Sequence, residues 1–200
     1  MNKDILICGV GGQGTVLASK IIAASAMDMG ETVHSAETIG MAQRGGSVTS
    51  HVRIGDDAYS PLIPLSSADM ILAFEPAEAV RNLKYLKKGG TVIANTVATR
   101  PVSATLKDDG YDGSGMREYL ESKCDCIFTD SEKICEGYGS VKFFNIIMLG
   151  IAAGSGRLGI DKETILKQIE SKVPEKYREI NKEAFMTGFA VGAGANVQTV

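Results

Sequence analysis

The chain alternates short apolar runs with longer segments whose apolar residues recur at helical spacing. Between residues 47 and 54, Val48, Val52 and Ile54 fall on one face of an extended chain, and polar residues such as His51 fall on the other. This period of two is typical of a strand whose polar face lies at the surface. Apolar runs predict further strands over residues 4–10, 32–37, 68–75, 89–96 and 124–130.

Helices are predicted between these strands and throughout the last third of the chain. The expected helices cover residues 14–30, 76–86, 141–154, 162–172 and 175–194. Gly30 suits the end of the first helix, and Pro76 suits the first turn of the second. Ser140 and Asp161 are expected to cap the two that follow. Asn145, inside a very apolar helix, is interpreted as a buried amide that ties neighbouring backbone groups together.

This alternation predicts an α/β fold, a three-layer α/β/α sandwich with a mostly parallel central sheet and a helical C-terminal third. The run at 68–75 is apolar throughout, as expected of a central parallel strand covered on both faces. The length of 200 residues suits one domain. We therefore expect a single domain over residues 1–200, with the helices from about residue 140 packed on it.

Composition excludes several classes of protein. The chain is 44% hydrophobic and 22% charged, which supports a buried core and excludes a disordered chain. The net charge of -3 gives no argument for a nucleic acid or an anionic membrane as partner. The longest apolar run, at 143–154, is too short to span a bilayer, and no signal-peptide pattern is present. We expect a cytoplasmic protein with no nucleic-acid or membrane partner.

The four cysteines do not form a metal or cluster motif. Their spacings include one CxC, at Cys124 and Cys126, but no CxxC and no ferredoxin-type ladder. Structural zinc normally takes four ligands, and His34 and His51 lie far from this pair in sequence. We interpret Cys8 as a core residue and the CxC pair as part of a strand, and we expect no metal site.

The strongest motif is GVGGQG at residues 9–14, directly after the first strand and at the start of the first helix. It satisfies GxGxxG in the required strand-to-helix context. The glycines allow a tight turn and leave backbone N–H groups at the helix start open to an anion such as a phosphate. The candidate cofactor-binding residues are Gly9, Gly11, Gly12, Gln13 and Gly14.

The match to a dinucleotide site is incomplete. Such a site needs a carboxylate about 20 residues further on, at the end of the second strand. Glu37 is near that place, but as the last residue of the expected run, after His34-Ser35-Ala36, it is interpreted as pointing past the strand. The alternative is a glycine turn that packs a helix tightly on a strand and binds nothing.

A second unusual stretch, GMAQRGGSVTSHVRI at 40–54, places Arg44 beside two glycines at the start of a strand. Paired glycines let the backbone approach a partner closely or adopt positive φ. The planar guanidinium of Arg44 can bind a carboxylate or phosphate through two N–H groups. The alternative is a tight turn with a surface arginine.

Together, these two stretches resemble the gamma subunit, or gamma domain, of the 2-oxoacid:ferredoxin oxidoreductases, the family of the pyruvate and ketoisovalerate oxidoreductases. The segments AFEPAEA at 73–79, GGTVIANT at 89–96 and NKEAFMTGF at 181–189 fit the same pattern, as does Asn145 followed by MLG. The resemblance covers nearly the whole chain. Within the family, it is strongest to the smaller, beta-type subunit of the indolepyruvate ferredoxin oxidoreductases.

The resemblance implies an oxidative decarboxylation of a 2-oxoacid with coenzyme A, giving an acyl-CoA, CO2 and reduced ferredoxin. The family uses thiamine diphosphate, Mg²⁺ and [4Fe-4S] clusters. Its thiamine site has a GDG stretch followed by an Asn-rich segment, which neither IGDDAY nor KDDGYDG matches in this chain. We expect a large partner subunit to hold these cofactors and to receive ferredoxin, and we expect no catalytic residue here. In isolation the chain is then inactive and is expected to form a homodimer.

The resemblance also implies that the gamma domain helps to close the active site and to accommodate coenzyme A. Glu75, at a strand's end before Pro76, is expected to face a cleft, because ligands of open α/β sheets bind at that edge. The expected loop for substrate or partner comprises Met41, Gln43, Arg44, Gly45, Gly46, Ser47 and Glu75.

Two other functions fit parts of the sequence. GxGxxG alone is compatible with a stand-alone oxidoreductase that binds a nicotinamide or flavin cofactor. The fold of an enzyme subunit is also compatible with a noncatalytic regulatory binding module.

Overall fold

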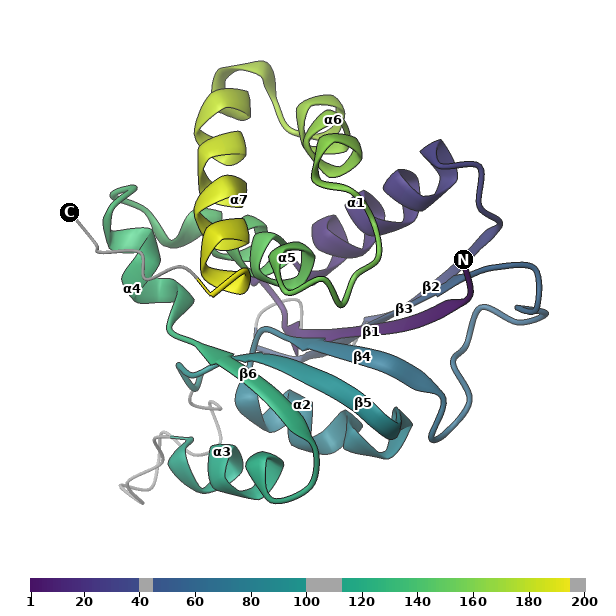
Figure 1. The fold of residues 1–200 in the computed structure, drawn as a ribbon. Helices are drawn as coiled ribbons and strands as arrows, with labels where there is room; N and C mark the ends of the chain where they lie inside the picture. Colours follow the sequence, from purple (N-terminus) through teal and green to yellow (C-terminus); the bar gives the residue numbers. More distant parts are fainter. Residues whose placement is uncertain (40–44, 100–112, 195–200) are drawn as a thin grey trace.

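The computed structural model describes residues 1–39, 45–99 and 113–194. At its centre is a six-stranded sheet in the order β2-β3-β1-β4-β5-β6 (Figure 1). The strands are β1 (Lys3–Val10), β2 (Val33–Ile39), β3 (Ser47–Ile54), β4 (Ala68–Ala73), β5 (Leu86–Asn95) and β6 (Asp125–Thr129). Strands β1, β4, β5 and β6 pair in parallel. The predicted, mostly parallel sheet is confirmed.

Strand β3 is the exception, because it runs antiparallel to both of its neighbours, β1 and β2. Only residues 40–46 connect β2 to β3. Parallel neighbours need a crossover of a dozen or more residues, so this short connection allows only an antiparallel pair. The mixed character of the sheet was therefore readable from the length of one loop.

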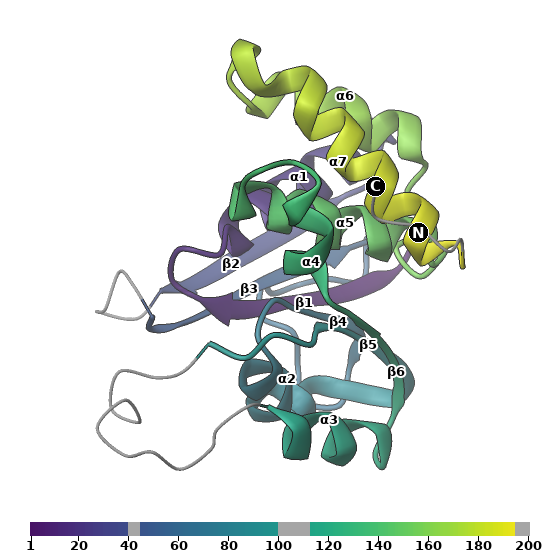
Figure 2. The same cartoon turned by 90° about the vertical axis from the view of Figure 1, so that its left-hand side faces the viewer.

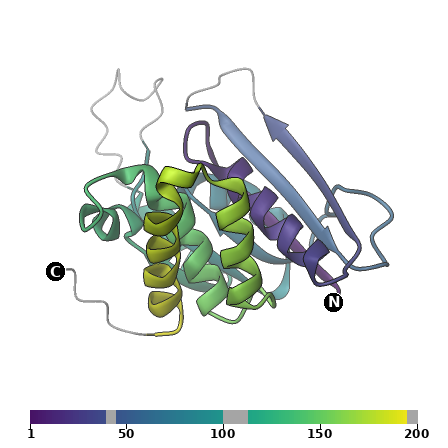
Figure 3. The same cartoon turned by 90° about the horizontal axis from the view of Figure 1, so that it is seen from above.

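Helices cover both faces of the sheet (Figure 2). Helices α2 and α3 lie on one face, and α1 and α5 lie on the other, where α6 and α7 pack on them. Seen from above, α7, α6 and α1 lie side by side (Figure 3). The helices are α1 (Thr15–Asp28), α2 (Pro76–Asn82), α3 (Ser114–Glu121), α4 (Ser131–Glu136), α5 (Phe144–Gly154), α6 (Lys162–Lys172) and α7 (Arg178–Gly192). The predicted layers and the helical C-terminal third are confirmed.

Strand β1 shows why its sequence is apolar throughout. Ile5 and Ile7 point into the core beneath α1 and α5. Leu6 and Cys8 point into the opposite core, which includes residues of α2 and α3. Both faces of the strand are buried, so its apolar residues form a continuous run instead of alternating with polar ones. Cys8 is the core residue that the sequence predicted.

Several predicted boundaries are confirmed at the level of single hydrogen bonds. Gly30 follows α1 with φ of 82°, and the side chain of Asp161 accepts the N–H of Thr164 at the start of α6. Ser140 caps a short 3-10 segment, η3 (Val141–Phe143), that leads into α5. Similar segments follow α2, as η1 (Leu83–Tyr85), and precede α7, as η4 (Glu175–Tyr177).

Other expectations about single elements were wrong. Helices α3 and α4 were not predicted, and α2 with η1 ends at Tyr85, so that β5 begins earlier than expected. His51 is only 5% exposed, not a surface residue. Its Nδ1 accepts the N–H of Ile63 at 3.2 Å, because the β3–β4 connection folds over this face of the strand. No helix in the described ranges is long and apolar enough to cross a membrane.

Candidate functional site

The two unusual stretches of the sequence meet at one edge of the sheet. Parallel strands bring the carboxyl ends of β1 and β4 to this edge, and β3, which runs the other way, begins there. Val10 of β1 pairs with Ser47 of β3. Beyond this pair, the N–H of Gly11 donates to the carbonyl of Gly46 at 2.8 Å, and the N–H of Gly45 donates to the carbonyl of Gly11 at 3.2 Å. The glycine-rich turn and the Gly45–Ser47 turn are thus one hydrogen-bonded structure.

The glycines of the first turn have different physical reasons to be glycine. A Cβ at Gly9 would lie 2.7 Å from Oε1 of Gln13, and one at Gly14 would lie 2.5 Å from Nδ2 of Asn145. Gly14 also has φ of 81°, and Gly12 has φ of 104°. A Cβ at Gly12, however, would meet nothing within 4 Å in the described structure. Gly9 and Gly14 are required because a larger residue would collide with a packed neighbour. Gly12 is favoured by its positive φ, and the space beside its backbone is open among the described residues.

Gln13, predicted to bind a cofactor, uses both ends of its amide inside the chain. Its Oε1 accepts the N–H of Val10 at 2.8 Å. Its Nε2 donates to the carbonyl of Phe74 at 3.1 Å and to Oγ1 of Thr99 at 3.4 Å. The side chain therefore closes the glycine turn and joins the ends of β1 and β4.

The start of α1 opens into a cavity of about 280 Å³. In the part of the chain that the structure describes, no side chain caps this helix, and its first turn holds no acidic residue. Uncapped N–H groups and the helix dipole favour an anion there. Lys142 and Thr99 also line the cavity, together with one carboxylate, Glu132, whose pKa is raised by burial and by Asp130. Among the described residues, the lining comprises Gly12, Gln13, Gly14, Thr99, Glu132, Val141, Lys142, Phe144 and Asn145.

Asn145 differs from its sequence-based interpretation. It is 7% exposed, so it is buried as expected. Within the described ranges, however, its amide makes no hydrogen bond to the backbone groups around it; it lies against Gly14 instead. The amide faces the cavity at α1 and also a larger cavity on the other side. Its amide atoms are not among the fully buried side-chain atoms without a partner, so water or a ligand in the cavities can satisfy them.

The second turn connects to two buried carboxylates at the start of α2. Oγ of Ser47 donates to Oε2 of Glu78 at 2.7 Å, and Glu78 also pairs with Arg81. Glu75 is 1% exposed, and its side chain accepts the N–H of Glu78 at 3.0 Å, capping α2. Burial, with these carboxylates nearby, raises the pKa of the Cys8 thiol. Met41, Gln43 and Arg44 lie outside the described residues.

The described residues do not form a metal or cluster site. They contain no group of three or more histidine, cysteine, aspartate or glutamate side chains placed to hold a metal ion. The Sγ atoms of Cys124 and Cys126 lie 3.6 Å apart, and burial, with the neighbouring thiol, raises the pKa of Cys126 to about 12. Iron–sulfur clusters need thiolate ligands, commonly four. The donor set described here does not fit one.

The dinucleotide alternative is also disfavoured by the geometry. Glu37 lies within β2, not past its end, and Oγ of Ser19 donates to it at 3.4 Å. Strand β3 stands between β1 and β2. The second strand, which would carry a ribose-binding carboxylate, is therefore one position further from the glycine turn than in a dinucleotide-binding fold, where it neighbours the first.

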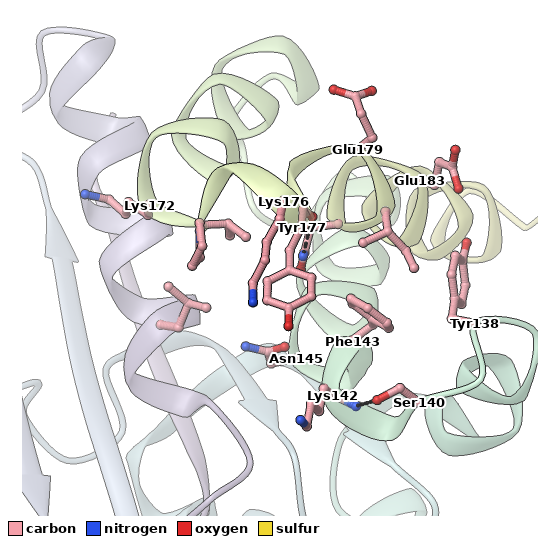
Figure 4. Close-up of a pocket in the computed structure, with 15 residues that line it drawn as sticks. Tyr138, Ser140, Lys142, Phe143, Asn145, Lys172, Lys176, Tyr177, Glu179 and Glu183 are labelled. Carbon is pink, nitrogen blue, oxygen red and sulfur yellow. Dashed lines mark hydrogen bonds between the residues drawn. The ribbon is translucent and has the colours of Figure 1, made fainter.

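A larger cavity of about 860 Å³ lies between α1, the start of α5 and η4 (Figure 4). Asn145 and Lys142 line this cavity as well as the smaller one. Lys176 and Tyr177 enter it from η4. Sequence analysis missed this cavity, because its walls come from three segments that are distant in sequence and carry no motif.

Comparisons with known proteins agree on one family. The profile described as pyruvate ferredoxin/flavodoxin oxidoreductase matches residues 4–191. The indolepyruvate oxidoreductase subunit IorB of Archaeoglobus fulgidus is 39% identical over 191 residues, 94% of this chain and 94% of that protein. The subunit of the same name from Thermococcus kodakarensis is 35% identical over 188 residues, 92% of this chain and 93% of that protein.

A solved structure supports the fold. The 2-oxoglutarate:ferredoxin oxidoreductase of Magnetococcus marinus, solved with 2-oxoglutarate, coenzyme A and succinyl-CoA bound, matches with a TM-score of 0.73 at 19% identity. The match covers 100% of this chain and 32% of that chain. The solved structure shares the fold of this chain. The matching family profile and the two relatives show that the chain belongs to the pyruvate ferredoxin/flavodoxin oxidoreductase family.

Proposed function

We propose that the chain is the small, non-thiamine-binding subunit of a 2-oxoacid:ferredoxin oxidoreductase that acts on indolepyruvate or a related aryl pyruvate. The observation that carries this proposal is the 39% and 35% identity to two indolepyruvate oxidoreductase subunits, over more than nine-tenths of each chain. The complete enzyme oxidatively decarboxylates the 2-oxoacid with coenzyme A, giving an acyl-CoA, CO2 and reduced ferredoxin.

The metal-ligating side chains of this chain decide which cofactors the proposal assigns to a partner subunit. A large partner subunit holds thiamine diphosphate, Mg²⁺ and the [4Fe-4S] clusters and passes electrons to ferredoxin. This agrees with the lack of a metal-ligating cluster in the described ranges. The present chain supplies a rigid wall and anion-binding groups, and no general acid, base or nucleophile.

The carboxyl edge of the sheet is the part of this chain that we propose faces the shared active site. The anionic part of coenzyme A binds at the glycine turn, next to the open backbone of Gly12 and the uncapped start of α1. Lys142 lies on the wall of the same cavity. The adjoining turn, with Gly45, Gly46 and Ser47, completes the wall toward the partner. The other residues of the expected loop, Met41, Gln43 and Arg44, lie outside the described residues.

Affinity purification from the native cell tests this proposal. A tagged copy of the chain should co-purify with a larger polypeptide that contains thiamine diphosphate and iron, identified by mass spectrometry and by cofactor analysis. Recovery of the chain without such a partner, or with a bound flavin or nicotinamide, would overturn the proposal in favour of one of the two alternatives.

A further inference from the structure

The larger cavity gathers donors from three elements, η3, α5 and η4, that have no hydrogen-bond or ion-pair partner among the described residues. In Figure 4 the side chains of Lys176 and Tyr177 point from η4 toward Asn145 at the start of α5, and Lys142 lies beside it. We infer that this cavity binds a small organic anion, in which one carboxylate or phosphate group is joined to an apolar body.

The polar groups match an oxyanion and do not satisfy one another. Asn145 is 7% exposed and its amide has no hydrogen bond in the described structure. Lys142 and Lys176 have no carboxylate within salt-bridge distance among the described residues, and the Lys176 ammonium lies 4.7 Å from the ring centre of Tyr177. An amide NH₂, a phenol and two ammonium groups are all donors that carboxylates and phosphates accept.

Hydrogen bonds fix the backbone that carries two of these donors, Tyr177 and Lys142, before a ligand arrives. Nδ2 of Asn181 donates to the carbonyl of Tyr177 at 2.7 Å, and the N–H of Tyr177 donates to the carbonyl of Pro174 at 2.8 Å. Oγ of Ser140 accepts the N–H of Lys142 at 3.2 Å. Preorganised donors bind an anion with less loss of conformational entropy than mobile ones do.

The rest of the cavity suits the apolar body of such a ligand. Leu17, Phe143, Val173 and Ile180 contribute apolar walls, and about 860 Å³ lies in the range of small-molecule sites. Two carboxylates, Glu179 and Glu183, also line the cavity, but both point away from Asn145 in Figure 4. Glu179 is in addition paired with Lys182 at 3.1 Å.

Lys172 also lines the cavity, but its ammonium points away from Asn145 in Figure 4. It is therefore not among the donors gathered there. The inference rests on none of the assumptions about coenzyme A or a partner subunit, because binding to this cavity can be measured on the isolated full chain.

Fluorescence anisotropy of indole-3-acetate tests the inference directly. The chain contains no tryptophan, so the indole signal comes from the probe alone. We expect saturable binding of indole-3-acetate and at least tenfold weaker binding of the neutral indole-3-acetamide. Lys176→Met and Tyr177→Phe should each weaken the binding of the acid several-fold, and together at least tenfold, while leaving the melting temperature unchanged.

Lys84→Met is the matched control. Lys84 precedes Tyr85 in a 3-10 segment of the same kind and lies 5.4 Å from its ring centre, but it lies outside the cavity lining. It should leave binding unchanged. Displacement by phenylacetate or by phenyl phosphate identifies the preferred oxyanion. Three results would overturn the inference. Indole-3-acetamide could bind as tightly as indole-3-acetate, or Lys84→Met could weaken binding as much as Lys176→Met. The third is a failure of both phenylacetate and phenyl phosphate to displace the probe.

Discussion

At the scale of the residue, two positions of the glycine-rich turn are glycine for different reasons. One has a closely packed neighbour, and the other has only a left-handed backbone conformation. Gly12 and Gly14 both have positive φ, but among the described residues only Gly14 has a neighbour, Asn145, where its Cβ would lie. The sequence motif alone treats these glycines as equivalent, because it encodes spacing and not what surrounds each position. The structure distinguishes them, and the difference is measurable.

Alanine substitutions test this distinction. Gly12→Ala should lower the free energy of unfolding by about 1–2 kcal/mol, the usual penalty of left-handed backbone for a residue with a Cβ. Gly14→Ala should lower it by roughly 3 kcal/mol or more, since it also displaces the buried Asn145. Urea denaturation measures both.

Gly115→Ala in α3 serves as the control, since Gly115 has no strained φ and no neighbour within 4 Å. It should be neutral or stabilising by up to about 1 kcal/mol, because alanine has the higher helix propensity. Equal losses for Gly12→Ala and Gly14→Ala would contradict the assignment of Gly14 to packing.

The buried thiol of Cys135 predicts that the free energy of unfolding falls at alkaline pH. Burial, with Glu132 nearby, raises the pKa of its thiol to about 11, whereas an unfolded cysteine titrates near ~8.5. Below the unfolded pKa both states keep the proton, and the stabilisation is fully present. As the pH rises toward the folded pKa, only the unfolded chain loses the proton, so stability falls by up to about 1.4 kcal/mol per pH unit.

The measurement compares urea midpoints of the native chain and Cys135→Ala from pH 7 to pH 10.5. Lysine and tyrosine titrate in both proteins, so the difference between the two curves isolates the thiol. Cys135→Ala should be less stable at neutral pH and lose less on raising the pH. Parallel curves would show that this thiol does not retain its proton on folding.

At the scale of the element, the central feature of the helical layer is the contact between α5 and α7. Gly150 and Gly154 of α5 lie against the backbone of α7, and Gly188 and Gly192 of α7 lie against that of α5. Each pair has four-residue spacing, so the glycines fall on one side of each helix. The boundaries of both helices followed from capping and periodicity, whereas this packing did not, because the glycine spacing reads as an interface only when the two helices are placed together.

Gly188→Ala should therefore lower the free energy of unfolding by roughly 3 kcal/mol. A Cβ there would lie under 3.0 Å from the carbonyl of Ile147, which is backbone and cannot rotate away. Overpacking of a close contact costs typically about 1–3 kcal/mol. Thermal melting measures the loss against Ala190→Gly on the same helix, which should cost only about 1 kcal/mol by propensity. A smaller loss for Gly188→Ala than for the control would show that the helices can separate freely.

At the scale of the molecule, patterning predicted the layers and the direction of most strands. It could not predict that β3 lies between β1 and β2, that His51 is buried or that a cavity surrounds Asn145. These depend on which segments become neighbours, and hydrophobic periodicity contains no information about that. The expected positions of Met41, Gln43 and Arg44 stay predictions, because they lie outside the described residues.

The molecule also carries a surface suited to association. Tyr59, Leu62 and Leu65, in the connection between β3 and β4, are 93%, 53% and 62% exposed. We expect the isolated chain to self-associate through them, and Leu62→Ser with Leu65→Ser to shift it toward the monomer without lowering its melting temperature. Val141→Ser is the control: this side chain is 65% exposed but lies outside the β3–β4 connection, so its replacement should leave the oligomeric state unchanged. Light scattering across a wide concentration range decides this, and a native chain that is monomeric throughout would contradict it.

The most direct test of the whole account is an activity assay of the purified chain, alone and with its co-purified partner. The assay contains indolepyruvate, coenzyme A, thiamine diphosphate, Mg²⁺ and a viologen dye as electron acceptor. The account predicts dye reduction dependent on coenzyme A only when both polypeptides are present. Dye reduction above background by this chain alone would contradict its assignment as a noncatalytic subunit.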